Sequence, residues 1–111
     1  MTNLDVIKTF VTVMDCGSIV AAARARGYST AAVSRQIGRL QRRLGVRLFV
    51  PEGRSIRPTL AAEQYVGRAR RLTQAAHEFE QFSVQFASER IVAQEPLASH
   101  LPVIREPAAV D

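Results

Sequence analysis

The chain has 111 residues, 47% of them hydrophobic and 6% aromatic, which allows one small domain with a modest core. Its longest apolar run, residues 19–23, is far too short to cross a bilayer, so no membrane partner is expected. The N-terminal segment MTNLDVIK is unlike a secretory signal. The single cysteine, Cys16, cannot form an internal disulfide, so the sequence fits the reducing cytoplasm.

The net charge of +5 is unevenly distributed along the chain. Residues 1–59 carry ten Lys and Arg side chains against three acids, a net charge of +7, whereas residues 60–111 carry five arginines against seven acids, a net charge of −2. A basic half joined to a mildly acidic half favours contact between the first half and a polyanion. Charge alone is weak evidence, because many charged surfaces face only solvent.

Three short helices are predicted in the basic half. Apolar residues recur at helical spacing over residues 3–15 and over 30–44, and a shorter helix is predicted from Ile19 to about Arg26. Serines precede the second and third helices as N-caps, and glycines end all three. These residues are Gly17, Ser18, Gly27, Ser29 and Gly45. The tight turn at residues 27–29 gives the layout of a helix-turn-helix, which generic three-helix cores also share.

The next segment, residues 46–59, has a different pattern. Strand-like pieces at residues 47–50 and 55–57 flank the turn Pro51-Glu52-Gly53-Arg54. This pattern predicts a small β-hairpin, or wing, with Arg54 at its tip.

A long helix is predicted to follow, capped by Thr59 and running from Leu60 to about residue 91, roughly 45 Å at about 1.5 Å per residue. Apolar residues spaced by three and four form a seam that this small chain cannot cover. The same helix of a second subunit is the expected cover, and packing back onto the first helix is the alternative. The seam residues expected to dimerise are Tyr65, Ala69, Leu72, Ala76 and Phe79.

The predicted organisation is therefore a winged helix-turn-helix domain at residues 1–59, a linker and dimerisation helix at 60–91, and a tail at 92–111. Three prolines in that tail, at positions 96, 102 and 107, disfavour helix, so we expect it to be extended or disordered.

The third helix carries the sharpest functional signal, because it has four arginines and no acid. The N-terminal turn of a recognition helix enters the major groove of DNA. Small residues at Ala31 and Ser34 let the backbone approach the base edges, and Arg35 can pair with a guanine or a phosphate. Arg42 and Arg43 lie two turns further on and are expected to face only solvent.

Two further contacts are predicted outside this helix. Arg54, at the wing tip, can enter a narrow minor groove. Ser18 caps the second helix, whose N-terminus can also bind a phosphate, although capping alone explains the serine. The predicted DNA-binding residues are Ser18, Thr30, Ala31, Ser34, Arg35 and Arg54.

The run AVSRQIGRLQRRLGVRLF at residues 32–49, with Ala22-Ala23, Ser29 and Gly53-Arg54, resembles the N-terminal domain of LysR-type transcriptional regulators. The resemblance covers about residues 3–90. It implies a mainly α fold: a winged helix-turn-helix of three helices and a small β-hairpin wing, followed by a long linker helix that pairs antiparallel in a dimer. It also implies regulation of transcription through interrupted palindromes, in the bacterial cytoplasm at the nucleoid.

Several residues depart from the family pattern. Arg26 stands where the family usually has a core Leu, so we expect poorer packing there unless the side chain reaches outward. Pro51 replaces a frequent Arg, and Pro58 and Ala62 replace the usual Leu and Gly. These changes predict weakened or altered DNA affinity.

Family members normally carry a further effector-binding domain, and this sequence does not resemble its start. A fragment, a natural short form or a decayed gene would each explain the length. We expect no small-molecule effector site and no cofactor.

Two functions are compatible with these features. The first is sequence-specific binding of double-stranded DNA by a homodimer. The alternative is a short interaction subunit that heterodimerises through the linker helix with a full-length relative and modulates it. No enzyme and no metal site are expected, because no His, Cys, Asp and Glu cluster has ligand spacing and no glycine-rich phosphate loop follows a strand. The operator, and whether binding activates or represses, stay open.

Overall fold

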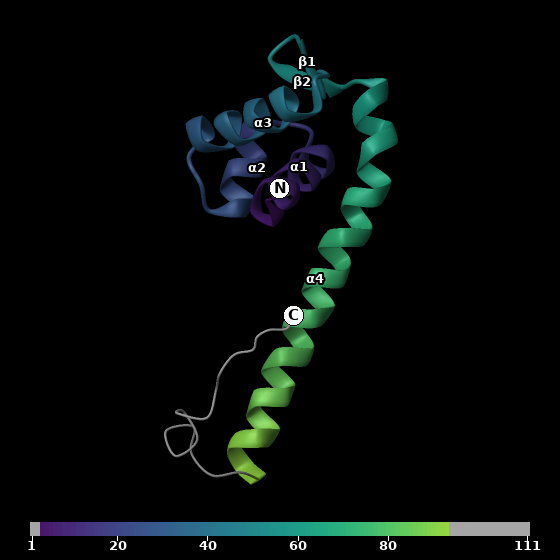
Figure 1. Cartoon of the computed structure of the whole chain (residues 1–111). Helices are drawn as coiled ribbons and strands as arrows, with labels where there is room; N and C mark the ends of the chain where they lie inside the picture. The colour runs from purple at the N-terminus through teal and green to yellow at the C-terminus, as the bar shows by residue number, and fades with distance from the viewer. Residues whose placement is uncertain (1–2, 94–111) are drawn as a thin grey trace. The chain divides into compact units, whose positions relative to one another are not determined.

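The computed structural model describes residues 3–93, and most of the predicted tail lies outside the described residues. Three helices are followed by a two-stranded antiparallel hairpin and a long helix, which confirms the predicted fold class (Figure 1). The elements are α1 (Leu4–Cys16), α2 (Ile19–Arg26), α3 (Thr30–Leu44), β1 (Phe49–Glu52), β2 (Ser55–Pro58) and α4 (Leu60–Ala93). The last helix runs two residues past its predicted end.

The helices begin where side-chain oxygens accept hydrogen bonds from otherwise unpaired backbone N–H groups of the first turn. Ser18 and Ser29 cap α2 and α3 as predicted, each with its Oγ 3.0 Å from a backbone nitrogen three residues on. Thr59 caps α4 through its Oγ1, 3.2 Å from the nitrogen of Ala62. The first helix starts one residue later than predicted, because Asn3 is its cap.

The turn between α2 and α3 depends on Gly27, which has a φ of 73°. This left-handed conformation is costly for residues with a Cβ, so glycine ends α2 and reverses the chain within two residues. The backbone nitrogen of Tyr28 then donates to the carbonyl of Ala23 at 2.9 Å. This closed turn fixes the direction in which α3 begins.

The core lies where the helices and the hairpin meet, and Phe10 is at its centre. Phe10 is fully buried, with its ring centroid 5.8 Å from that of Phe49 and 5.5 Å from that of Tyr65. The hairpin and the first turns of α4 are thus packed on α1. An ion pair of 2.8 Å between Arg70 and Asp15 adds a polar contact between α4 and the end of α1.

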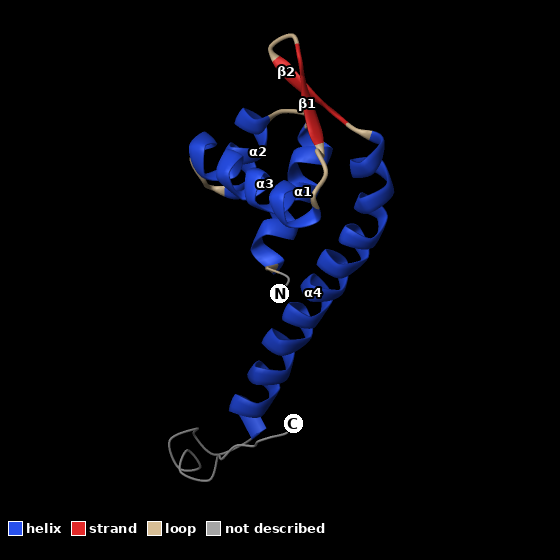
Figure 2. Cartoon of the chain, turned by 45° about the horizontal axis from the view of Figure 1, so that its top comes forward, coloured by secondary structure: helices blue, strands red, loops and turns tan. Residues whose placement is uncertain are grey.

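The hairpin differs from its prediction in where the turn lies. Pro51 and Glu52 belong to β1, and the chain reverses at Gly53-Arg54 alone. The register pairs Phe49 with Pro58 and Glu52 with Ser55. A proline is tolerated in β1 because each strand of a two-stranded sheet has a free edge, where no N–H donor is needed. For this reason the presence of Pro51 does not require it to lie in the turn, where the sequence pattern had placed it. The hairpin projects from the three helices (Figure 2).

Of the described residues, those up to Ala76 form one compact unit and those from His77 to Ala93 belong to a second. The beginning of α4 belongs to the first unit, because Ala62 and Ala69 are almost fully buried in its core. Small side chains on this stretch allow close packing of the helix against the rest of the unit.

Replacing Phe10 by alanine should lower the free energy of unfolding by about 3–5 kcal/mol, because it removes the ring shared by α1, β1 and α4 and leaves a cavity. Urea unfolding followed by circular dichroism, at one fixed protein concentration, measures the change. Val20→Ala, at a side chain that is 58% exposed, is the matched control and should change stability little. Equal effects of the two substitutions would contradict this account of the core.

Candidate nucleic-acid interface

The four candidate residues of α3 lie together on its exposed face. Thr30, Ala31, Ser34 and Arg35 are all solvent-exposed, and they occupy the first two turns of the helix. The opposite face, formed by Val33, Ile37 and Leu40, is buried in the core. The helix therefore presents two small side chains and one guanidinium outward while it is held from behind.

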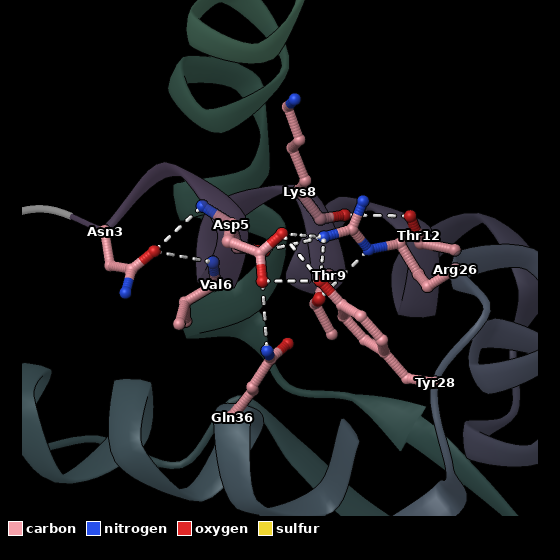
Figure 3. A network of polar contacts seen from close by, with 9 residues as sticks. All are labelled: Asn3, Asp5, Val6, Lys8, Thr9, Thr12, Arg26, Tyr28 and Gln36. Atoms are coloured by element: carbon pink, nitrogen blue, oxygen red, sulfur yellow. Dashed lines mark hydrogen bonds and ion pairs between the residues drawn. The ribbon is translucent and has the colours of Figure 1, made fainter. Parts of the chain in front are cut away.

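A polar network that the sequence did not reveal joins α3 to α1 and α2 (Figure 3). The carboxylate of Asp5 accepts hydrogen bonds from the Tyr28 hydroxyl at 2.7 Å and from Gln36 Nε2 at 3.2 Å, and it forms an ion pair with Arg26. Asp5 lies on α1, Arg26 ends α2, Tyr28 is in the turn and Gln36 is on α3. One carboxylate thus connects all three helices next to Arg35.

The structure corrects the expectation that Arg26 packs poorly or turns outward. Its side chain is 18% exposed and is paired at two nitrogens: Nε donates to Thr9 Oγ1 at 3.1 Å, and Nη2 donates to the backbone oxygen of Asp5 at 3.2 Å. The guanidinium carbon also lies 5.1 Å from the centre of the Tyr28 ring. A charge at this position is tolerated because it has polar partners on α1. These partners are 21 and 17 residues away in the sequence, so no local sequence pattern predicts them.

The network shifts the ionisation of its acidic members. The hydroxyl of Tyr28, followed by the guanidinium of Arg26, lowers the pKa of Asp5 below its usual value, although burial opposes the shift. The hydrogen bond to the Asp5 carboxylate, together with burial, raises the pKa of Tyr28. Both shifts favour an ionised Asp5 and a neutral Tyr28 at neutral pH.

The wing places Arg54 in the two-residue turn of the hairpin, where its side chain is exposed. Ser55, the next residue, donates from its Oγ to the carbonyl of Gly17 at 2.7 Å. Gly17 precedes Ser18, the cap of α2, so the fold brings the wing beside the N-terminus of α2. The bond thus joins residues 38 apart in sequence, each of them adjacent to one of these two predicted DNA contacts.

The base of the wing is held by side-chain contacts to the backbone. Gln41 of α3 accepts at its Oε1 from the backbone nitrogen of Leu48 at 2.7 Å and from that of Phe49 at 3.3 Å. The Thr59 hydroxyl donates to the carbonyl of Arg47 at 2.7 Å. Residues 47–49, at the base of the wing, are therefore held by two side chains, and no local sequence pattern predicts this role for Gln41.

The predicted dimerisation residues on α4 fall into two groups. Tyr65 and Ala69 pack against the core of their own chain, which is the alternative cover considered from the sequence. Leu72 and Phe79 are 44% and 67% exposed, and Ala76 is half-buried. The aromatic series continues beyond them: the Phe79, Phe82 and Phe86 ring centroids follow at 6.4 and 5.7 Å.

Within residues 3–93 no three His, Cys, Asp or Glu side chains come close enough together to hold a metal ion. No helix in this part of the chain has the length and apolar character needed to span a membrane.

A sequence profile of the family described as "Bacterial regulatory helix-turn-helix protein, lysR family" matches residues 4–63. The matched region contains the three helices, the hairpin and the start of α4. The candidate residues Ser18, Thr30, Ala31, Ser34, Arg35 and Arg54 all fall inside it.

Two curated relatives are transcriptional regulators. The chain is 40% identical over 67 residues to the HTH-type transcriptional regulator AbaB of Streptomyces antibioticus, covering 60% of this chain and 22% of that protein. It is 34% identical over 105 residues to the HTH-type transcriptional regulator CrgA of Neisseria meningitidis, covering 90% of this chain and 35% of that protein. The chain thus spans about a third or less of the length of these relatives.

Solved structures share the fold. The DNA-binding domain of CbnR in complex with DNA superposes with a TM-score of 0.68 at 29% identity, covering 78% of this chain and 99% of that one. Oxidised OxyR of Corynebacterium glutamicum superposes with a TM-score of 0.72 at 28% identity, covering 75% of this chain and 27% of that one.

Replacing Asp5 by asparagine should flatten the acid side of the stability profile. Because the folded pKa of Asp5 is lowered, its contribution to stability is present above the unfolded value of about 3.9 and is lost as the pH falls through the folded value. The variant should be less stable than the wild type at neutral pH, and the difference should shrink below about pH 4. Melting temperatures measured from pH 7 to pH 2 test this, and a constant difference would exclude the assigned role of Asp5.

Proposed function

Because this chain belongs to the LysR family of bacterial regulatory helix-turn-helix proteins, we propose that it is a dimeric, sequence-specific DNA-binding regulator. In this proposal α3 enters the major groove of double-stranded DNA and the wing enters an adjacent minor groove. The observation that carries the proposal is the exposed first half of α3, whose outward residues Thr30, Ala31, Ser34 and Arg35 are backed by a buried apolar face.

Major-groove binding requires a helix that can approach the base edges closely and then read them. Ala31 and Ser34 are short enough to let the helix backbone approach, and the forked guanidinium of Arg35 matches the two acceptors of a guanine. Thr30, in the first turn, offers a hydroxyl to a phosphate or a base. The turn at Gly27 and the Asp5 network orient this face, so little ordering has to occur on binding.

Contacts to the flanking DNA would come from the wing and from α2. Arg54 is exposed in the hairpin turn, and a narrow minor groove concentrates the negative potential that attracts arginine. The N-terminus of α2, capped by Ser18, presents backbone N–H groups that suit a phosphate. The hydrogen bond from Ser55 to Gly17 supports a single continuous surface for these two contacts.

Dimerisation is proposed through the part of α4 whose apolar side chains the chain itself leaves exposed. Leu72, Phe79, Phe82 and Phe86 follow one another at intervals of three, four and seven, which suits pairing with a second helix. A dimer places two recognition helices on one duplex and accounts for palindromic sites. The family resemblance implies that the two linker helices run antiparallel.

The cellular location and the mode of action of the protein follow from the same proposal. A regulator of this family acts on the bacterial chromosome, so we place this protein in the cytoplasm at the nucleoid. Its named relatives are transcriptional regulators, and we propose that this chain likewise acts by binding and not by catalysis.

Replacing Arg35 by alanine should weaken binding to the preferred duplex by about 1–3 kcal/mol and relax sequence choice at one position in each half-site. The preferred duplex is first obtained by selection from a random DNA pool with the purified chain, and affinities are then measured by fluorescence anisotropy. Arg68→Ala, which removes an exposed charge on α4 outside the proposed surface, is the control. Failure of the wild type to bind any duplex at low salt would reject the proposed function.

Replacing Phe79 by glutamate should convert the dimer to a monomer, because two carboxylates would face an apolar seam. Val84→Glu is the matched control: Val84 is 72% exposed on the same helix and lies off the seam. Sedimentation equilibrium reports the mass of each variant. If both variants stay dimeric, dimerisation does not use this seam. In a separate co-expression with a full-length relative, recovery of only mixed dimers would favour the heterodimeric alternative.

A further inference from the structure

Gly38, in the middle of α3, has an unusual surrounding for a helical glycine. Glycine destabilises a helix interior relative to alanine, and Gly38 has no positive φ that would require it. A Cβ built at Gly38 would meet a single side-chain atom, Nη1 of Arg42, at 3.4 Å. The guanidinium of Arg42 therefore lies back over Gly38, in the direction in which helical side chains point.

The surface around Gly38 is hollowed. A shallow depression of about 300 Å³ is lined by Gly38, Gln41, Arg42, Gly45, Val46 and Arg47. Two arginines contribute to it, one from the last turns of α3 and one from the segment that leads to the wing. This segment is rigid, because Gln41 holds the nitrogen of Leu48 and Thr59 holds the carbonyl of Arg47.

We propose that this depression binds a phosphate of the DNA backbone, with Arg42 and Arg47 as its ligands and with Gly38 leaving the room in which the Arg42 guanidinium lies. The inference rests on the proposed function, since it extends the surface of Ser34 and Arg35 along α3. It replaces the expectation that Arg42 faces only solvent.

The dimensions of DNA agree with this placement. Gly38 follows Ser34 by four residues, a rise of about 6 Å along the helix axis. The major groove is about 12 Å wide, so a helix that reads bases near Ser34 has the phosphates at the edge of the groove within reach of Arg42. Open depressions with two guanidinium groups suit a phosphate, because each group can donate two hydrogen bonds.

The favourable interaction of cations with a helix C-terminus could explain why arginines are found at the end of α3, but it does not explain the direction of the Arg42 side chain. Cations near a helix C-terminus are favourable, and that effect needs no ligand. The side chain of Arg42, however, folds away from the helix end and over Gly38. Arg39 and Arg43 instead line a different cavity, with Asn3, Val6, Ile7, Leu40 and Tyr65, so the helix distributes its arginines to two sides.

The first test measures the salt dependence of binding with the full chain, on the selected duplex and on a duplex of random sequence. Each lost phosphate contact makes the fall of log affinity with log salt less steep by about 0.9, and a dimer loses two such contacts. Affinity should therefore fall about 12-fold less between 50 and 200 mM salt in Arg42→Gln and in Arg47→Gln than in the wild type. Both duplexes should show the change, because backbone contacts carry no sequence information. Arg39→Gln removes the same charge from the other side of α3 and should keep the wild-type slope.

The second test uses Gly38→Ala, for which stability and binding should change in opposite directions. Alanine should raise the melting temperature, because it favours the helix and meets only the flexible end of Arg42. It should also weaken binding to both duplexes, because the methyl group takes the space in which the Arg42 guanidinium lies and displaces that ligand. Wild-type binding by Gly38→Ala, or equal slopes for Arg42→Gln and Arg39→Gln, would overturn the inference while leaving the proposed function intact, whereas a wild type that binds no duplex would overturn both.

Discussion

The packing around Phe10 is the constraint on which the rest of the first unit depends. Its buried ring contacts Phe49 of β1 and Tyr65 of α4, so one side chain sets how both the wing and the beginning of the long helix lie on α1. Tilted and edge-on aromatic pairs add a directional preference to the burial of apolar area. The position of Arg54 and the direction in which α4 leaves the core are thus consequences of a residue that has no part in binding.

Helix α3 is held by two kinds of contact, one that contributes stability and one that contributes direction. Its apolar face contributes most of the stabilisation, through burial of Val33, Ile37 and Leu40. The hydrogen bond from Gln36 to Asp5 contributes direction, because it ties α3 to a carboxylate that Arg26 and Tyr28 already orient. A leucine in place of Arg26 would fill volume, whereas the guanidinium joins helices through bonds of defined geometry. Replacing a whole ion pair by apolar side chains often changes stability little, whereas removing one partner leaves the other charge uncompensated, so the contribution specific to this pair is orientation.

The long helix divides its apolar stripe between two tasks. In its first turns Ala62 and Ala69 allow a close approach to the core, and Tyr65 completes the Phe10 cluster. Later the stripe carries Phe79, Phe82 and Phe86, which the chain leaves exposed. The first helix and a second subunit, the two covers considered from the sequence, are therefore not exclusive. The chain's own core covers the stripe at Ala62, Tyr65 and Ala69, and a second subunit is proposed to cover it further along the helix.

The sequence by itself determined the order of the helices, their capping residues, the hairpin and the family, because these depend on local preferences and on a contiguous run of residues from 32 to 49. It also placed Thr30, Ala31, Ser34 and Arg35 on one face, because the helical period alone decides that. Only the tertiary structure decided that Arg26 is paired with Asp5, that Ser55 holds the wing beside Ser18, and that Tyr65 and Ala69 serve the core of their own chain. These contacts join residues far apart in the sequence, and their geometry follows from how whole elements pack, which no local pattern encodes.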